Sequence, residues 1–425
     1  MPGPLEGIRV LEISQIVVGP YCGMMLADLG ADVLKIEPPG GEGGRLIGGF
    51  MPGESKSYHA LNRGKRSLVL DLQRPEAQAL VQRVIPHFDV FIINSRAGVP
   101  GRLGVDYETL AKSRPDLVYM ENTGYGDEGP SAQRAGSDIV AQAYSGLMAG
   151  EGKVNEFGAP RQITSTAIGD FATGLAAAMG ICAALYRRAL SGRGDHIKTS
   201  LLATALSIQS GTVGRLPVSD EIYQRPLLEE VERLRAAGAP WADIVKARDA
   251  RRRTGGAFAN YYNTYRVKDG AITLGALTPR NQQQIRDVLG ITEDPMLHPD
   301  FNAADPAWAA KVEALATDIR ARMLTRTMDE WIEAFDAAGA PASKVNIPED
   351  LADDPQVRAM GYMIEVDHSI TGPERWPGAV TRHANFPTGT SRPAPALGQH
   401  TDESLLELGL TAEEVAELRR CGAAE

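Results

Sequence analysis

Asp170 is the residue with the clearest potential for chemistry, because it opens a long segment of helical character rich in small residues, GDFATGLAAAMGICAALYRRALSG. A carboxylate at a helix start is favoured by the helix dipole and by free backbone N–H groups. Capping is the commonest use of such an aspartate, and the local pattern favours it. The same carboxylate could instead attack an electrophile and form a covalent intermediate. The residues around Asp170 leave both interpretations open.

Anion binding is the second chemistry that the residue types suggest. Three turns rich in glycine could bring backbone N–H groups to an anion: Gly19-Pro20, residues 40–45 and residues 126–130. None matches a phosphate-binding loop motif, so each by itself is better explained as an ordinary turn. The basic segment NRGKRS, residues 62–67, could hold a phosphate with help from Arg102, or it could be a solvated loop.

Metal and histidine chemistry have little support in the sequence. The seven histidines show no H-x-x-x-H spacing, and no G-x-S-x-G motif indicates a nucleophilic serine. Cys22, Cys182 and Cys421 are far apart, which argues against a zinc site or a disulfide framework. We therefore expect no metal site and a reducing environment.

The overall composition limits the partners. The chain has 425 residues with a formal net charge of -10, whereas a nucleic-acid-binding surface is basic. The N-terminus lacks the pattern of a secretory signal, and no apolar run reaches the ~18 residues of a membrane span. We expect a cytoplasmic protein without nucleic-acid or membrane partners.

The elements that must position Asp170 alternate between strand and helix. Strands are predicted over 8–14, 33–37, 67–72 and 89–94, and residues 196–207 begin as a strand and turn helical. Helices are predicted over 21–30, 74–86 and 165–190. Nearly continuous apolar strands separated by helices predict an α/β fold with a parallel, doubly wound sheet.

The character of the chain changes after about residue 215. Residues 226–253 have the charge pattern of an exposed helix, residues 261–277 predict a hairpin with an Asp269-Gly270 turn, and 306–337 is helical. Residues 341–400 are rich in proline and loops, and 401–421 is a short helical segment. The predicted domains are 1–224, a small domain over 225–340, and a C-terminal segment over 341–425 that returns to the first domain.

In order along the chain, several motifs together resemble the family III CoA-transferases (the CaiB/BaiF family), which include formyl-CoA transferase and carnitine CoA-transferase. The motifs are LEGIRVLEIS, GPYCGMMLADLGADVLKIEPPGG, NRGKRSLVLDL, GYGDEGP, AGSDIVAQA, the segment that contains Asp170, and LGQHTDESLLELGL. The resemblance covers nearly the whole chain, and the ordered set is highly specific.

The resemblance implies both a fold and a reaction. It implies a Rossmann-like large domain with a smaller α+β domain, in an interlocked homodimer. It further implies that Asp170 attacks an acyl-CoA thioester, giving a mixed anhydride and then an aspartyl-CoA thioester that passes CoA to a free carboxylic acid. Acyl-CoA and the acid are then the substrates, with no tightly bound cofactor.

Further site residues follow from the resemblance. Gln15 and Ser137 are expected in the active site, and Gly255 and Gly256 correspond to a mobile glycine loop that covers the aspartyl intermediate. Arg102 is the expected phosphate partner, since a guanidinium suits a phosphate. The expected CoA contacts are Ile16, Val17, Val18, Leu70, Gln73, Asn94, Ser95, Arg96 and Arg102.

Departures from the family pattern decide between related activities. Formyl-CoA transferase has other residues where this chain has Val17, Pro38 and Ser137, which argues against formyl-CoA and oxalate as the substrates. An α-methylacyl-CoA racemase is the alternative, but racemases carry a histidine where this chain has Ser137, so the second acid/base is missing. A non-catalytic acyl-CoA-binding subunit, or one subunit of a heteromeric transferase, is a further alternative, and retention of Asp170 argues against a non-catalytic role. Family habit suggests succinyl-CoA as donor and a dicarboxylate or aromatic acid as acceptor.

Overall fold

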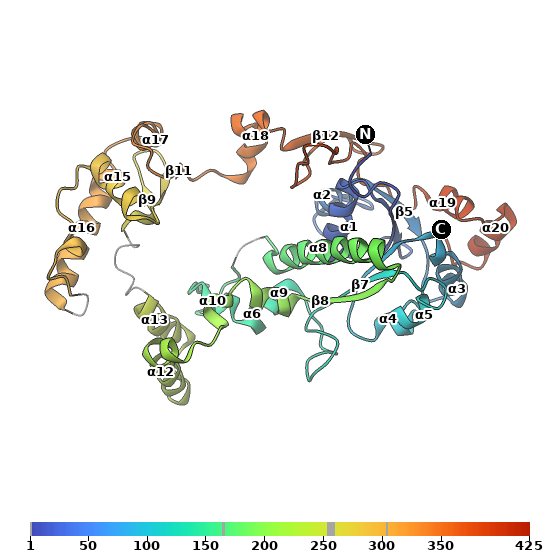
Figure 1. Cartoon of the computed structure of the whole chain (residues 1–425), viewed down its shortest axis with the longest axis horizontal. Helices are drawn as coiled ribbons and strands as arrows, with labels where there is room; N and C mark the ends of the chain where they lie inside the picture. The colour runs from blue at the N-terminus through green and yellow to red at the C-terminus, as the bar shows by residue number, and fades with distance from the viewer. Residues whose placement is uncertain (1, 164–165, 253–259, 303–304) are drawn as a thin grey trace. The chain divides into compact units, whose positions relative to one another are not determined.

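The computed structural model describes residues 2–163, 166–252, 260–302 and 305–425, and the chain forms two compact units (Figure 1). The first unit comprises Met1–Lys153, Pro160–Gly214 and Pro355–Glu425, so both ends of the chain belong to it. The second unit comprises Val154–Ala159 and Arg215–Asp354. The candidate nucleophile, Asp170, lies in the first unit.

A six-stranded sheet, parallel throughout, forms the centre of the first unit. Its strand order is β5-β2-β1-β6-β7-β8, so the order reverses direction between β1 and β6. In open α/β sheets, ligands bind at such a switch point, outside the carboxyl ends of the strands. The strands are β1 (Arg9–Ile13), β2 (Asp32–Glu37), β5 (Lys65–Val69), β6 (Val90–Asn94), β7 (Val118–Thr123) and β8 (Asp195–Ser200).

Both faces of the sheet are buried, because successive strand side chains point to opposite sides. Val10, Val90 and Val118 pack in one cluster with α1 (Val18–Asp28) and α8 (Ile168–Ser191). The other face, with Leu11, Phe91 and Tyr119, packs against three helices from the two ends of the chain. These are α3 (Pro75–Val84), α19 (Thr401–Glu407) and α20 (Ala412–Arg420).

Shorter elements complete the first unit. Helices α2 (Lys56–Asn62), α6 (Asp138–Ser145) and α9 (Leu201–Ser207) are the longest of them, and β3 (Gly49–Met51) pairs with β4 (Glu54–Ser55). Strands β12 (Met363–His368) and β13 (Gly372–Pro377) form an antiparallel hairpin. The rest are α4 (Val99–Arg102), α5 (Tyr107–Leu110), α7 (Leu147–Gly150), α10 (Ser210–Val213) and α18 (Pro355–Ala359).

The second unit has its own core around a three-stranded antiparallel sheet of order β11-β10-β9. Strands β9 (Tyr262–Arg266) and β10 (Ala271–Gly275) form the predicted hairpin, which is therefore confirmed. Trp331 and Phe335 stack in this core. The remaining elements are β11 (Ala342–Lys344), α11 (Pro217–Ser219), α12 (Arg225–Ala236), α13 (Trp241–Arg252), α15 (Pro279–Leu289), α16 (Pro306–Met323) and α17 (Met328–Ala337).

Two local predictions were wrong, and some strands were missed. Gly19-Pro20 does not form a turn after the first strand, because both residues lie in the first turn of α1, where the missing N–H of proline costs nothing. The predicted helix over 306–337 is two helices, because Thr327 caps the second one in a capping box with Glu330. Strand β7 and the β12–β13 hairpin were not predicted, since polar residues such as Asn122 interrupt their apolar pattern.

Candidate active site

A cavity of about 250 Å³ opens at the switch point of the sheet, and we call it the Asp170 cavity. Its walls come from the segments after β1, β6 and β7 together with the starts of α6, α8 and α9. It is lined by Gln15, Ile16, Val17, Val18, Asn94, Ser95, Arg96, Asn122, Thr123, Gly124, Gly136, Ser137, Asp170 and Leu201. The fold therefore gathers Asp170 with eight other residues predicted for the site.

Asp170 is the third residue of α8, yet it does not cap the helix. Among the described residues, its carboxylate takes part in no hydrogen bond. The capping role belongs to Asp138, whose Oδ1 accepts the N–H groups of Gly169 at 2.8 Å and of Asp170 at 3.2 Å. Asp138 in turn accepts a hydrogen bond from the Gln142 side chain at 2.5 Å. The Asp170 carboxylate is thus positioned through its backbone and is left free for another partner.

The charge state of Asp170 differs from the sequence-based expectation. The helix dipole predicted a stably ionised carboxylate, but burial, with the nearby charge of Asp138, raises the pKa of Asp170 to about 7. The side chain is 9 % exposed, so the cost of desolvation exceeds the gain from the dipole. Near neutral pH the ionised and the protonated forms of Asp170 are therefore both populated.

The turn that follows β1 has an unusual backbone. Ile16 has φ of 68°, and among the described residues no other non-glycine residue has a positive φ. Glu42 accepts the N–H of Ile16 at 3.0 Å, and the Asn94 side chain bonds the Gln15 backbone twice, at 2.8 and 3.0 Å. Such a conformation costs of order 1–3 kcal/mol and persists where the surroundings enforce it.

Glu42 also decides how the glycine-rich segment 40–45 is used. Its carboxylate accepts the N–H of Gly44 at 2.5 Å as well as that of Ile16. The segment therefore surrounds its own side chain rather than an external anion. Lys35 lies 3.8 Å from Glu42 and donates to the Ser14 carbonyl at 2.8 Å, which links the segment to the end of β1.

Neither of the two roles left open for the basic segment 62–67, phosphate binding or a solvated loop, fits the structure, because its cations are buried in internal ion pairs. Arg63 pairs with Asp28, and Arg66 pairs with Asp32 at 2.5 Å. Lys65 pairs with Glu12 at 2.9 Å beneath α1. Burial lowers the pKa of Lys65 to about 8 although Glu12 opposes the shift. Burial would raise the pKa of Glu12, but the charges of Lys35 and Lys65 outweigh it and lower that pKa to about 2. These cations stabilise the scaffold and do not face a ligand.

Five lining residues were not predicted from the sequence: Asn122, Thr123, Gly124, Gly136 and Leu201. Two of them are explained by close backbone approach, since a Cβ on Gly124 would lie 3.0 Å from the Cα of Gly136. This contact brings the start of α6, with Ser137, to the end of β7. Asn122 is 5 % exposed, and its Nδ2 has no hydrogen-bond partner among the described residues. Had a strand been predicted over 118–123, Asn122 would have stood out as a polar amide within a buried strand.

Comparisons with known proteins show to which family the chain belongs. Residues 5–250 and 226–401 match CoA-transferase family III. The chain belongs to CoA-transferase family III. It is 31 % identical over 408 residues to the succinyl-CoA:glutarate CoA-transferase of Homo sapiens, covering 95 % of this chain and 86 % of that one. It is 32 % identical over 424 residues to the succinate–glutarate CoA-transferase of Agrobacterium fabrum, covering 95 % and 96 %.

A solved structure extends the similarity to three dimensions. The crystal structure of a CaiB/BaiF family protein from Brucella suis matches with a TM-score of 0.72 and 28 % identity, covering 96 % of this chain and all of that one. The protein described here is accordingly a CoA-transferase, an enzyme whose substrates are CoA thioesters.

The remaining residues predicted for this family III enzyme lie elsewhere. The Leu70 side chain is in the sheet core, and Gln73 and Arg102 are exposed. None of the three lines the Asp170 cavity. Gly255 and Gly256 lie outside the described residues. Contacts of all these residues with CoA stay predictions.

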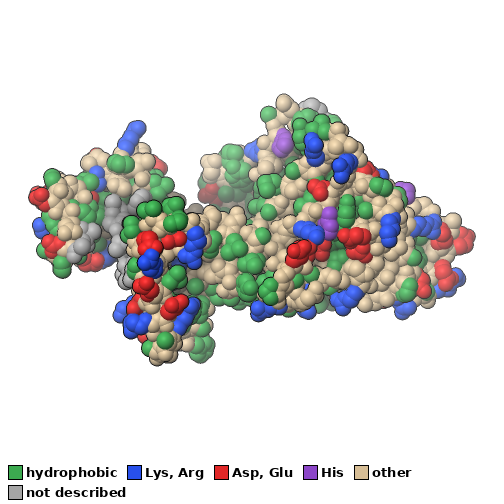
Figure 2. Space-filling model, turned by 60° about the horizontal axis from the view of Figure 1, so that its bottom comes forward, with side chains coloured by type: hydrophobic (Ala, Val, Ile, Leu, Met, Phe, Trp, Pro, Cys, Tyr) green, Lys and Arg blue, Asp and Glu red, His purple; other side chains and the backbone are tan. Residues whose placement is uncertain are grey.

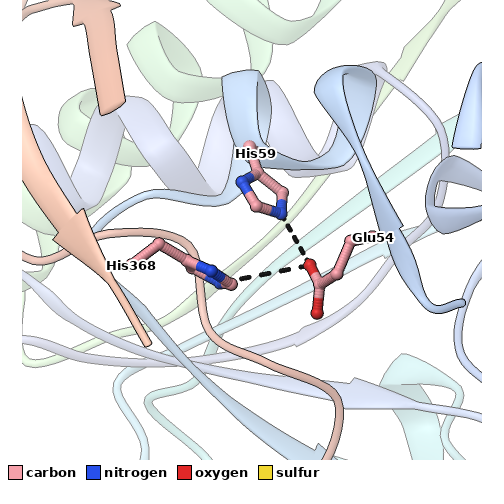
Figure 3. A group of neighbouring side chains, drawn as sticks. All are labelled: Glu54, His59 and His368. Carbon is pink, nitrogen blue, oxygen red and sulfur yellow. Dashed lines mark hydrogen bonds and ion pairs between the residues drawn. The ribbon is translucent and has the colours of Figure 1, made fainter. Parts of the chain in front are cut away.

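A cluster of buried titratable residues joins α2 to the β12–β13 hairpin (Figure 3). His59 bonds Glu54 at 2.6 Å through Nε2 and Glu374 at 2.7 Å through Nδ1. Potential metal-ligand atoms of Glu54, His59 and His368 all lie within 4.8 Å of one another. However, Nδ1 of His368 accepts the N–H of Thr371 at 3.2 Å, which leaves the proton on Nε2. His368 therefore directs an N–H, not a lone pair, toward Glu54 at 4.0 Å without a hydrogen bond, and the two hydrogen bonds of His59 form the link.

Proposed function

We propose that Asp170 is the nucleophile that exchanges CoA between an acyl-CoA thioester and a free carboxylic acid. The observation that carries the proposal is the carboxylate itself: it faces the switch-point cavity and takes part in no hydrogen bond with the described residues. A nucleophile needs this freedom, whereas a capping aspartate would be occupied. The raised pKa fits a group held in a desolvated site.

The exchange proceeds in balanced steps. A carboxylate oxygen of Asp170 attacks the thioester carbon, and the carbonyl electron pair forms an oxyanion. Collapse of the oxyanion breaks the carbon–sulfur bond and gives an aspartyl mixed anhydride and CoA thiolate. The thiolate then attacks the aspartyl carbonyl, releasing the first acid and leaving aspartyl-CoA, and the acceptor acid repeats the sequence in reverse. Division into such steps is ordinary covalent catalysis.

Groups around Asp170 would stabilise each oxyanion. The side chains of Gln15 and Asn122 and the backbone N–H groups at the start of α1 border the same cavity. Arg102 and the loop of Gly255 and Gly256 are proposed to bind CoA phosphate and to cover the aspartyl intermediate, as the family resemblance implies. The proposal includes a homodimer, and succinyl-CoA as donor, in keeping with the names of the human and Agrobacterium relatives.

Racemisation at an α-carbon is less well supported. That chemistry needs a second acid/base within reach of the substrate. This chain has Ser137 at the position where racemases carry a histidine. No histidine is among the residues that line the cavity in the described part of the chain. A serine hydroxyl has no suitable pKa for this role at neutral pH.

Replacement of Asp170 tests the proposal. Asp170→Ala should lower the rate of CoA exchange from succinyl-CoA to a panel of carboxylic acids by at least about 10³-fold, as loss of a covalent nucleophile does. Binding of CoA, measured by calorimetry, should change little. In the parent enzyme, hydroxylamine added during turnover should mark Asp170, as seen by peptide mass. Exchange by the alanine variant at near the parent rate would exclude this mechanism, and rapid deuterium wash-in at the α-carbon of a 2-methylacyl-CoA would favour racemisation.

A further inference from the structure

Gln142 is a buried residue of α6 that lies one helical turn after Asp138 and is 1 % exposed. Its Nε2 donates to Oδ2 of Asp138 at 2.5 Å, and its Oε1 accepts the N–H of Ile163 at 3.0 Å. Gln142 does not line the Asp170 cavity, and no step of the proposed reaction uses it. It can therefore influence the reaction only through the residues that it holds.

The two partners fix which way the amide of Gln142 points. The backbone N–H of Ile163 needs an acceptor, and the carboxylate of Asp138 needs a donor. With the amide turned over, its NH2 group would meet the Ile163 N–H and its oxygen would meet the Asp138 carboxylate. Such a clash of like groups is costly in a buried place. The side chain of Gln142 therefore has one orientation, which residues on both sides of it in the sequence determine.

Asp138 uses both of its carboxylate oxygens in this arrangement. Oδ2 accepts the amide of Gln142, while Oδ1 accepts the N–H groups of Gly169 and Asp170. The approach is close, since a Cβ on Gly169 would lie 2.8 Å from Oδ1. Both oxygens turn together about the same side-chain bonds, so a carboxylate that is held at Oδ2 is also held at Oδ1. Gln142 thus restrains the backbone that carries the nucleophile.

The same contact also restrains a charge. Burial and, after it, the negative charge of Asp138 raise the pKa of Asp170 to about 7. Arg96 is the other charged residue among those that line the cavity. An amide N–H that donates to a carboxylate stabilises its negative charge. Gln142 therefore helps to keep the charge of Asp138 next to the nucleophile.

We propose that Gln142 is a positioning residue for CoA exchange, which holds Asp138 in the orientation that sets both the backbone and the charge environment of Asp170. The proposal rests on the proposed function, because it assumes that Asp170 is the nucleophile. It adds that part of the reactivity depends on a side chain outside the cavity. Loss of the amide should change the rate of exchange and its pH dependence, and should leave substrate binding nearly unchanged.

Gln142→Met is the test variant, since methionine has a similar length, adapts to buried sites and lacks the amide. Exchange is measured from succinyl-CoA to the best acceptor of the acid panel. The kcat should fall at least about ten-fold, because a small displacement of a reacting group is costly. KM for succinyl-CoA should change less than about three-fold. The acid limb of kcat/KM should move to lower pH by roughly 0.5 to 1 pH unit, since the charge of Asp138 is held less firmly beside Asp170.

A double-mutant cycle tests whether Gln142 acts through Asp138. In an Asp138→Asn background, Gln142→Met should lower kcat little further and should not move the limb again. Gln209→Met is the matched control, because the Gln209 side chain donates to the carbonyl of Ser145, at the other end of α6, at 2.8 Å. This control should change neither kcat nor the limb. A residue that only supported the fold would lower Tm and leave the limb in place.

Gln142→Glu provides a second test, also if the methionine variant does not fold. A protonated glutamic acid offers Asp138 a donor and Ile163 an acceptor, as the amide does, whereas an ionised one offers no donor. The glutamate variant should therefore be active near pH 6 and lose kcat toward pH 9.5, an alkaline limb that the parent lacks, at a temperature where circular dichroism shows it folded.

Three results would overturn the role of Gln142. They are parent kcat with an unmoved limb in Gln142→Met, equal losses with and without the charge of Asp138, and an alkaline profile of Gln142→Glu that matches the parent. Each of them leaves Asp170 as the nucleophile. Exchange that survives Asp170→Ala would instead contradict the proposed function itself.

Discussion

At the start of α8 the cap is Asp138 and not Asp170, for which the sequence left a helix cap and a nucleophile open as alternative roles. Asp138 satisfies the N–H groups at the start of α8 and so fixes the backbone of Asp170. Its charge also helps burial to raise the pKa of Asp170 to about 7. In the proposed mechanism only the ionised carboxylate of Asp170 attacks the thioester, so we expect the fraction of active enzyme to fall as pH falls through about 7. Asp138 is therefore expected to set where the acid limb of the activity lies.

Asp138→Asn tests this relation at a single residue. The variant keeps an oxygen that can accept the N–H of Gly169 and removes the negative charge, so the pKa of Asp170 should fall. The acid limb of kcat/KM between pH 5 and 9 should move to lower pH, while Tm reports any folding defect. Asp402→Asn, at an exposed ion pair with Arg419, is the control and should leave the limb in place. A limb that stays at the parent position or moves to higher pH would refute the electrostatic role of Asp138.

The turn between β1 and α1 is the element on which the shape of the cavity depends. Four of its residues, 15–18, line the cavity, and Ile16 is held in the left-handed region. Helix α1 can approach the sheet closely because it has glycine at two positions. A Cβ on Gly19 would lie 2.3 Å from the Ser14 Cβ, and one on Gly23 would lie 1.8 Å from the Glu12 carboxylate. Glu42, buried beside Lys35, then restrains the turn from the opposite side. The turn is thus set by contacts from three separate segments.

Loss of Glu42 should disturb this turn in a graded way. Glu42→Ala leaves the N–H groups of Ile16 and Gly44 without acceptors and should lower the free energy of unfolding by about 1–3 kcal/mol per buried group. It should also lower kcat/KM at least about ten-fold through movement of the turn. Glu42→Gln keeps an acceptor and should recover part of both losses. Unfolding in urea and steady-state kinetics measure the two effects, with Glu417→Ala at an exposed ion pair with Arg420 as control. Full activity in Glu42→Ala would show that the turn holds its conformation without this carboxylate.

At the scale of the molecule, helix α8 presents two apolar faces. One face packs in the sheet core, and the other exposes a stripe formed by Leu175, Met179, Tyr186 and Leu190, with exposed fractions of 45 to 71 %. By length and composition alone α8 could cross a membrane, but its buried face is that of a core helix. On the face seen in Figure 2, basic and acidic side chains are interspersed instead of gathered by sign. An uncovered apolar stripe on an otherwise charged surface is typical of a subunit contact.

The family resemblance implies a homodimer, and we propose that the second copy of this chain covers the stripe. Light scattering behind size exclusion should give twice the chain mass of 45.6 kDa. Met179→Glu, which places a charge on the exposed stripe, should weaken the dimer, whereas Glu417→Ala on the exposed surface of α20 should not. A monomeric parent enzyme would exclude the homodimer, and sedimentation with vesicles would favour the membrane instead.

The sequence by itself determined the alternation of strands and helices, the parallel sheet and the β9–β10 hairpin, because apolar periodicity and turn residues are local signals. It also singled out Asp170, but only the ordered set of motifs raised that residue above a helix cap. Tertiary structure decided the rest: that Asp138 caps α8 from 32 residues away, that Lys65 and Arg66 are buried in ion pairs, and that Asn122 reaches the cavity. Hydrogen bonds, burial and charge pairing depend on which segments come into contact in the folded chain, and local sequence patterns do not contain that information. The carboxylate of Asp170 makes no hydrogen bond with the described residues for the same reason: Asp138, 32 residues away in the sequence, accepts the N–H groups at the start of α8.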